Sequence, residues 1–86
     1  MLKIYGSKLC PDCVECLEAF DRHGVSYEYF DFSENLQNLK EFLSLRDRES
    51  LFDPIKTAGS IGSPCIIDEA GKITLDWSIY VSQDNA

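Results

Sequence analysis

The chain has 86 residues, of which 15 are acidic and 8 are basic, and its net charge is -7 at pH 7. This length suits one small domain, which we expect to span residues 1–86. The negative charge repels phosphate backbones and anionic lipids, so nucleic acid and membrane surfaces are disfavoured as partners. No apolar run approaches the ~20 residues of a membrane span, and the first residues lack a signal-peptide pattern. We therefore expect a cytoplasmic protein.

Four cysteines are the most informative residues of the composition. Their share of the chain is below the ~8–10% that marks a disulfide-stabilised secreted domain. Three of them crowd into residues 10–16, which indicates thiol chemistry rather than structural cross-linking.

The first part of the chain predicts a strand, a helix and a second strand. The strands cover residues 2–5 and 25–32, where apolar and aromatic residues predominate. The helix begins at Pro11 and ends before Gly24. Its apolar residues recur at the helical spacing i, i+3, i+4, i+7 and are Cys13, Cys16, Leu17 and Phe20.

A second helix is predicted over residues 35–46. Its apolar face is expected to consist of Leu36, Leu39, Phe42 and Leu43. Residues 47–63 are ambiguous, because residues 49–52 could extend the helix and Asp53 with Pro54 could cap one further turn that ends at Gly59. An irregular segment of this length is typical of a functional loop.

The last part of the chain predicts a β-hairpin and a short helix. Strands at 65–67 and 72–75 flank a turn at 68–71, and Asp76 is placed to cap a helix that carries Trp77, Tyr80 and Val81. The element order is therefore β-α-β-α-β-β-α. A helical crossover makes the first two strands parallel, whereas the hairpin is antiparallel, so we expect an α/β fold with helices on both faces of a mixed sheet.

The sequence CPDC lies at the junction of the first strand and the first helix. With Pro11 at the first helical position, Cys10 is the N-cap, where its sulfur can accept hydrogen bonds from the backbone N–H groups of Asp12 and Cys13. These bonds and the helix dipole favour the thiolate and can lower a cysteine pKa from ~8.5 to about 3.5–7.5. Cys10 is therefore the candidate nucleophile, and Cys13, on the apolar face, is the candidate resolving thiol.

Two charged neighbours modify this expectation. Asp12 competes for the positive end of the dipole and repels a thiolate on Cys10. Lys8 could stabilise that thiolate, hold an acidic group of a substrate, or remain solvated.

Two interpretations of Cys16 and Cys65 are open. Each fits a small core residue, Cys16 on the helix stripe and Cys65 at the start of a strand, with a regulatory thiol as an alternative for Cys65. Alternatively, Cys10, Cys13, Cys16 and Cys65 together form a thiolate set for zinc or an iron–sulfur cluster.

Three segments in the right order carry a family resemblance. They are IYGSKLCPDC at 4–13, HGVSYEYFD at 23–31 and GSPCII at 62–67. With these segments the chain resembles the glutaredoxins of the thioredoxin superfamily. The resemblance implies a four-stranded sheet in the order 2-1-3-4 and a cis Pro64 that faces the redox pair. It also implies that Ser63 offers its backbone to an extended substrate.

The chain departs from the family pattern at the positions that bind glutathione. Members that use glutathione usually carry an aromatic residue where this chain has Asp12, and a glycine pair where it has Thr74 and Leu75. Asp76 matches the acidic residue that holds the γ-glutamyl end, and Lys8 is shifted by one from the usual basic position. The substrate-binding residues expected on this basis are Lys8, Pro11, Asp12, Ser63, Pro64 and Asp76.

The resemblance implies a thiol–disulfide oxidoreductase that reduces protein or glutathione mixed disulfides through Cys10 and Cys13. We expect the protein to be a monomer. It implies no bound cofactor. Its partners would be a disulfide-containing protein or a low-molecular-weight thiol, with glutathione or a reductase as electron donor. A metal or cluster carrier, and an interaction module that has lost turnover, are the alternatives.

Overall fold

The computed structural model describes residues 1–81. Its four strands form one mixed sheet in the order β2-β1-β3-β4, which confirms the expected order. β1 is parallel to β2 and antiparallel to β3, and β3 and β4 form the antiparallel hairpin. The strands are β1 (Leu2–Gly6), β2 (Tyr27–Asp31), β3 (Cys65–Ile67) and β4 (Ile73–Thr74).

Two strands are shorter than predicted because their flanking amides have other partners. The Val25 N–H donates to the Phe20 carbonyl at the end of the preceding helix, so β2 begins only at Tyr27. The Lys72 N–H donates to the Asp68 carboxylate, so β4 begins at Ile73. Backbone groups used in turns are lost to the sheet.

The helices follow the predicted order. α1 has Cys10 as its N-cap and Pro11 as its first residue, and the chain leaves it through Gly24, whose φ of 68° suits glycine. α2 is capped by the Asn35 side chain, which accepts from the Asn38 N–H. Within residues 1–81, no helix is long and apolar enough to cross a membrane. The helices are α1 (Pro11–Arg22), α2 (Leu36–Arg48) and α3 (Asp53–Thr57), with the 3₁₀ helices η1 (Ser50–Phe52) and η2 (Trp77–Tyr80).

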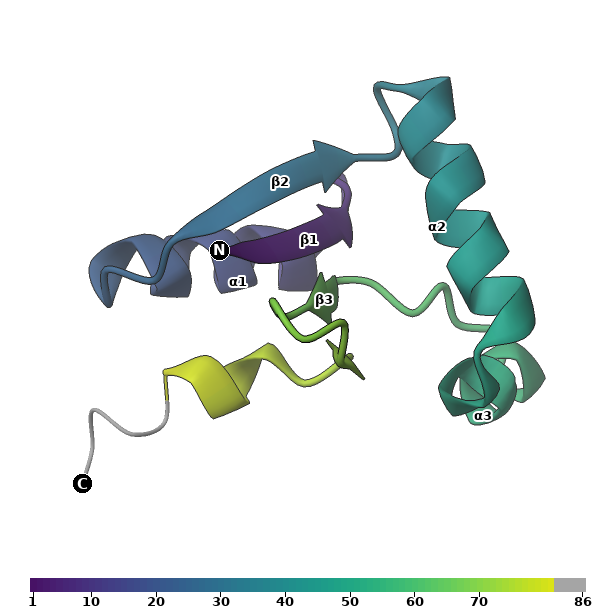
Figure 1. Ribbon diagram of the computed structural model, residues 1–86. Helices are drawn as coiled ribbons and strands as arrows, with labels where there is room; N and C mark the ends of the chain where they lie inside the picture. Colours follow the sequence, from purple (N-terminus) through teal and green to yellow (C-terminus); the bar gives the residue numbers. More distant parts are fainter. Residues whose placement is uncertain (82–86) are drawn as a thin grey trace.

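The sheet separates two apolar clusters. Neighbouring residues of a strand point to opposite faces, and Ile4 and Tyr5 accordingly belong to different clusters. Figure 1 shows α1 running alongside the strands and α2 crossing their direction near the ends of β1 and β2. The cluster on the α1 side contains Ile4, Cys16, Phe20 and Ile66, and the cluster on the α2 side contains Tyr5, Phe42, Leu45, Phe52 and Cys65. The expectation of helices on both faces is thus met.

The buried face of α2 differs from the predicted one. Phe42 and Leu45 are buried, whereas Leu36 is 67% and Leu43 is 41% exposed. Periodicity alone placed Leu36 and Leu43 on the core side, but α2 crosses the strands and buries only the part that meets Tyr5 and the other residues of its cluster.

The segment after α2 is more regular than expected. α2 ends at Arg48, and η1 and α3 follow as separate turns, so residues 49–52 do not extend the helix. Asp53 is the first residue of α3 rather than its cap, and the chain turns at Gly59 with a φ of 74°. The Arg46 guanidinium then donates to the carbonyls of Ile61 at 2.9 Å and Ser60 at 2.6 Å. Arg46 therefore fixes the loop that leads to Pro64.

The last turn packs on α1. Asp76 accepts from the Ser78 N–H at 3.1 Å and caps η2 as predicted, although the turn is 3₁₀ rather than α-helical. The rings of Trp77 and Tyr80 meet Phe20 of α1 edge-on, with centroids 6.3 and 5.9 Å away. These contacts hold the chain after β4 against the helix that begins at Cys10.

Candidate active site

Cys10 and Cys13 lie at the N-terminal end of α1 with different exposure. Cys10 is partly exposed, whereas Cys13 is 1% exposed. The Cys10 N–H donates to the Ser7 carbonyl at 3.0 Å, and the Cys10 carbonyl accepts from the Val14 N–H at 3.1 Å as the helix begins. These two bonds hold the backbone of Cys10 where the helix begins. In this arrangement the Cys10 thiol is partly exposed and the Cys13 thiol is buried.

The surroundings of Cys10 stabilise its thiolate. Burial raises the pKa of Cys10. Hydrogen bonds from the backbone N–H groups of Cys13 and Asp12, the Cys13 thiol and the Ser63 hydroxyl lower it by more than burial raises it, so the pKa of Cys10 lies below its usual value. The sulfur makes no N-cap hydrogen bond of regular geometry, in contrast to the expected cap. The amides act on a large, polarisable sulfur through electrostatics, which needs less exact alignment than a hydrogen bond to oxygen.

Cys13 has the opposite behaviour. Burial raises the pKa of Cys13 to about 11, and the charge of Cys10 and its hydrogen bond add to this rise, although the Ser7 N–H and the Ser63 hydroxyl oppose it. The pair therefore combines an accessible thiolate with a sheltered thiol.

Ser63 contributes a group that sequence reasoning missed. Its hydroxyl lies 3.7 Å from the Cys10 sulfur, and the Ser63–Pro64 peptide bond is cis, which is the geometry that the resemblance implied. Only the Ser63 backbone was expected to take part. The available signal was a hydroxyl side chain directly before the proline that the resemblance places beside the redox pair.

Gly6 lets the Cys13 thiol approach the end of β1. A Cβ atom at Gly6 would lie 2.9 Å from the Cys13 sulfur and 3.4 Å from the Tyr29 ring. Such a contact to sulfur is too short, so any side chain at Gly6 displaces Cys13.

Lys8 contacts acidic residues at the end of β2 and in the loop that follows it. Its ammonium pairs with Glu34, and its backbone N–H donates to Asp31 at 3.0 Å. The Asp31 carboxylate also accepts from the Ser33 N–H, the Ser33 hydroxyl and the Glu34 N–H. Burial raises the pKa of Asp31, but these hydrogen bonds outweigh burial and lower it. Asp31, which the sequence did not single out, therefore ties the loop before Cys10 to the end of β2.

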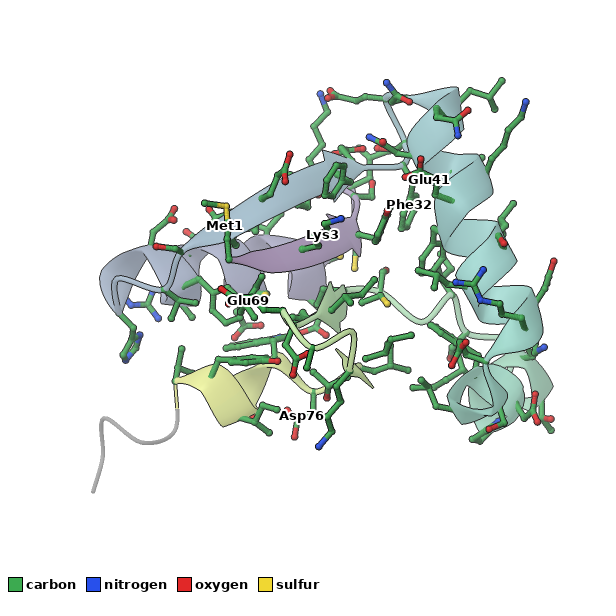
Figure 2. All side chains as sticks on the ribbon, in the orientation of Figure 1. Met1, Lys3, Phe32, Glu41, Glu69 and Asp76 are labelled. Carbon is green, nitrogen blue, oxygen red and sulfur yellow. The ribbon has the colours of Figure 1, made fainter. Side chains whose placement is uncertain are left out.

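The two acidic candidates have partners of their own. Asp12 accepts from the Trp77 indole N–H at 3.2 Å, which links the CPDC turn to η2. The Asp76 carboxylate accepts from both the N–H and the hydroxyl of Ser78, at 3.1 and 2.5 Å. Asp76 therefore caps η2, and Figure 2 shows it away from Phe32 and Glu41 at the α2 side of the molecule.

Cys16 and Cys65 are core residues, as the simpler reading expected. Both are 0% exposed, and burial raises the pKa of each thiol to about 12. They belong to clusters on opposite faces of the sheet. Within residues 1–81, no three His, Cys, Asp or Glu side chains converge on a metal-sized site. The hypothesis of a zinc or iron–sulfur site formed by four cysteines is therefore wrong, because the sheet separates two of the ligands.

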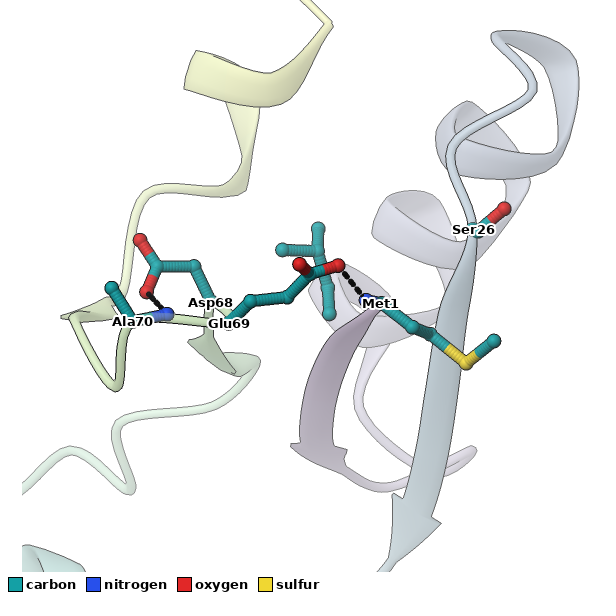
Figure 3. Close-up of a pocket in the computed structure, with 6 residues that line it drawn as sticks. Met1, Ser26, Asp68, Glu69 and Ala70 are labelled. Carbon is teal, nitrogen blue, oxygen red and sulfur yellow. Dashed lines mark hydrogen bonds and ion pairs between the residues drawn. The ribbon is translucent and has the colours of Figure 1, made fainter.

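Two hollows lie at opposite ends of β1. One of about 430 Å³ reaches Cys10 and is lined by Ser7, Leu9, Cys10, Pro11, Phe32, Ile61 and Ser63. A larger one of about 600 Å³ lies at the start of β1, where the Met1 ammonium pairs with Glu69 and no thiol is present in the lining (Figure 3). Chemistry thus favours the smaller hollow as the active site.

Comparison with known proteins identifies the family of the chain. The model of the family described as Glutaredoxin matches residues 2–51, which include the CPDC turn. The chain belongs to the glutaredoxin family. The match ends before Ser63 and Pro64, so the family model does not cover these two residues.

One curated relative and one solved protein extend the comparison. An uncharacterized protein of Haemophilus influenzae is 35% identical over 75 residues, which cover 87% of each chain. The crystal structure of the thioredoxin-like protein BC3987 has a TM-score of 0.64 and 21% identity, and covers 100% of both chains. A mutant of that protein gives the same TM-score and identity, with 98% of this chain and 96% of the other covered. The glutaredoxin-family chain thus has a thioredoxin-like fold.

Proposed function

We propose that this glutaredoxin-family protein is a thiol–disulfide oxidoreductase in which Cys10 attacks a disulfide and Cys13 resolves it. The observation that carries the proposal is the contrast within the pair. The pKa of the partly exposed Cys10 lies below its usual value, whereas the pKa of the buried Cys13 is raised to about 11. Only one of the two thiols is therefore ready to react with a disulfide in solution.

In the first step, the Cys10 thiolate attacks one sulfur of the substrate disulfide. A bond forms between Cys10 and that sulfur, the substrate S–S bond breaks, and the other substrate sulfur leaves as a thiolate that takes a proton from water. Ser63 and Pro64 lie beside Cys10 and are proposed to align the substrate, with the Ser63 backbone available as a short strand pairing.

The first step also prepares the second. The Cys10 charge and its hydrogen bond are two of the causes that raise the pKa of Cys13. Both disappear once Cys10 is part of a mixed disulfide, while the Ser7 N–H and the Ser63 hydroxyl continue to lower that pKa. Cys13 then loses its proton more easily and attacks the Cys10 sulfur, which releases the reduced substrate and leaves a Cys10–Cys13 disulfide.

Glutathione or a thioredoxin-type reductase would return two electrons to this disulfide and regenerate the dithiol. The chemistry needs no tightly bound cofactor. A reducing compartment such as the cytoplasm would keep the pair in its dithiol form.

Alkylation tests the proposal directly. At mildly acidic pH, iodoacetamide should label Cys10 at least about tenfold faster than Cys13, Cys16 or Cys65, because alkylation requires the thiolate. Mass spectrometry of peptides from briefly treated protein measures the order. Equal labelling of all four thiols would contradict the proposal.

A trapping experiment tests the assignment of the resolving thiol. Cys13→Ser should accumulate a mixed disulfide between Cys10 and a substrate peptide, whereas Cys16→Ser, the matched control on the same helix face, should release the reduced peptide. Intact-protein mass spectrometry detects the adduct. Release of product by Cys13→Ser at the rate of the control would show that Cys13 is not needed to resolve it.

A further inference from the structure

The surface beside Cys10 carries exposed apolar side chains. Two large aliphatic side chains border the reactive sulfur, and Leu9 is 78% and Ile61 is 58% exposed. Both line the hollow of about 430 Å³ that contains Cys10. Exposed apolar side chains that gather around a reactive group indicate a binding surface rather than chance exposure.

The hollow continues away from Cys10. A second one of about 320 Å³ adjoins it and shares two of its walls, Phe32 and Ile61. Its remaining lining includes Leu43 and Arg46 from α2, and Figure 2 shows Phe32 between the strands and α2. We define the two together as the apolar groove, lined along its length by Leu9, Phe32, Ile61, Leu39 and Leu43. The exposure of Leu43, which the sequence did not predict, belongs to this groove.

The charges around the groove do not suit glutathione, which is an anion at neutral pH. The part of the groove at Cys10 has no basic side chain in its lining. Lys8, the nearest lysine in the sequence, pairs with Glu34. Arg46 at the far end donates to the carbonyls of Ser60 and Ile61. The chain as a whole carries -7, so an anionic tripeptide is repelled.

We propose that the apolar groove selects polypeptide disulfides in which a bulky apolar side chain lies close in sequence to the attacked cysteine. This inference rests on the proposed function, because it assigns the substrate class of the Cys10 site. The groove extends from Cys10 past Ile61 to Leu43, so it can hold the flanking side chain of an extended segment, whereas a small disulfide fills only the end at Cys10. A second copy of the chain is a poor occupant, because two chains that each carry a net charge of -7 repel each other.

The electrons of the test reaction come from the protein itself. Cys10 attacks the peptide sulfur and the small thiol leaves, then Cys13 attacks Cys10 and the peptide thiol leaves. Two electrons thus pass from the dithiol to the substrate, and the protein ends as a Cys10–Cys13 disulfide.

Single-turnover kinetics with pre-reduced protein test the selection. Three mixed disulfides serve as substrates, and each has 2-mercaptoethanol as the leaving thiol. In the first, 2-mercaptoethanol is linked to a peptide with leucine and phenylalanine beside its cysteine. In the second, it is linked to the same peptide with serines in place of these two residues, and in the third to glutathione. The apolar peptide should react about tenfold faster than either other substrate at subsaturating concentration, because the groove buries its side chains.

Variants locate the effect. Ile61→Ser and Leu43→Ser should reduce the ratio of rates between the apolar and the serine peptide about fivefold to tenfold. Leu36→Ser is the matched control, because Leu36 is an exposed leucine of the same helix and is absent from the groove lining. It should keep the full ratio. Both groove side chains are exposed, so circular dichroism should show folded variants.

The outcomes separate the two proposals. Equal rates for the three substrates, a preference for glutathione, or an unchanged ratio in both groove variants would overturn the groove inference and leave the oxidoreductase intact. Failure to reduce any of the three disulfides would reject the oxidoreductase itself. Sedimentation measures the oligomeric state of the wild type and of Ile61→Ser. A wild-type dimer that becomes a monomer in Ile61→Ser would show that the groove binds a second copy of the chain, and would overturn the groove inference.

Discussion

The tip of α1 and the interior of the sheet each hold two cysteines, and the two environments treat the same side chain differently. At the tip, backbone N–H groups and the Ser63 hydroxyl surround Cys10, whose pKa is lowered despite partial burial. In the interior, burial raises the pKa of Cys16 and Cys65 to about 12, and within residues 1–81 no hydrogen-bond donor lowers the pKa of either thiol.

This comparison indicates that nearby hydrogen-bond donors, together with a smaller degree of burial, account for the lowered pKa of Cys10. Cys13 is intermediate, because it is as buried as the interior pair but lies within reach of the Ser7 N–H and the Ser63 hydroxyl. Its pKa of about 11 can therefore fall when Cys10 loses its charge. Within residues 1–81, Cys16 and Cys65 have no such hydrogen-bond donor, and both pack in the core.

The strongest test of the comparison exchanges one cysteine in each environment. Cys10→Ser should reduce disulfide reduction by roughly a thousandfold or more, because serine is not ionised at neutral pH. Cys65→Ala should keep the wild-type rate and lose about 1 kcal/mol of unfolding free energy, because it leaves a small void in the core. Activity assays and urea unfolding measure both. Loss of activity in a folded Cys65→Ala would break the comparison.

A methyl group at the end of β1 should disturb the tip alone. Gly6→Ala places a Cβ atom 2.9 Å from the Cys13 sulfur, so the resolving step should slow by about tenfold, as seen in accumulation of the mixed disulfide. Gly71→Ala is the control: its φ of 87° makes alanine strained, but within residues 1–81 the new Cβ meets nothing closer than 4 Å apart from its own chain neighbours. The control should lose stability and keep the resolving rate. A similar slowing in both variants would attribute the effect to strain.

A smaller effect is expected at the hydroxyl that contacts both thiols. Ser63→Ala removes a group that lowers the pKa of Cys10, so that pKa should rise and the rate of alkylation at mildly acidic pH should fall about twofold to fivefold. Above the raised pKa the alkylation rates of the wild type and Ser63→Ala should converge, because the Cys10 thiol is then ionised in both proteins. Ser63→Thr keeps the hydroxyl and should restore the wild-type profile. The ultraviolet absorbance of the thiolate, followed against pH, measures the shift, and an unchanged profile in Ser63→Ala would exclude the hydroxyl.

Local patterns predicted most of the fold. Pro11 and Gly24 marked the two ends of α1 because each suits a special backbone position, and the apolar spacing between them gave the face that holds Cys13, Cys16 and Phe20. The strand order came from the family resemblance and agrees with the structure. The face of α2 was wrong at Leu36 and Leu43, because a helical period does not say how far a sheet covers the helix.

Long-range pairs explain what the sequence could not provide at the candidate site. The partner of Lys8 is Glu34 and the partner of Asp12 is Trp77, and both contacts depend on how the loops meet after folding. The position of Cys10 at the N-cap was predictable from Pro11 alone. The donation of the Ser63 hydroxyl to its sulfur required the two segments in their folded positions.

The hydrogen bond between the Trp77 indole and Asp12 makes the intrinsic fluorescence of the protein a reporter on the CPDC turn. The chain has one tryptophan, and its indole N–H donates a hydrogen bond to Asp12, which lies between Pro11 and Cys13. Indole fluorescence is sensitive to the charge and polarity of its contacts. Emission of unlabelled protein should therefore differ between its oxidised and reduced forms, so that each turnover can be followed in real time.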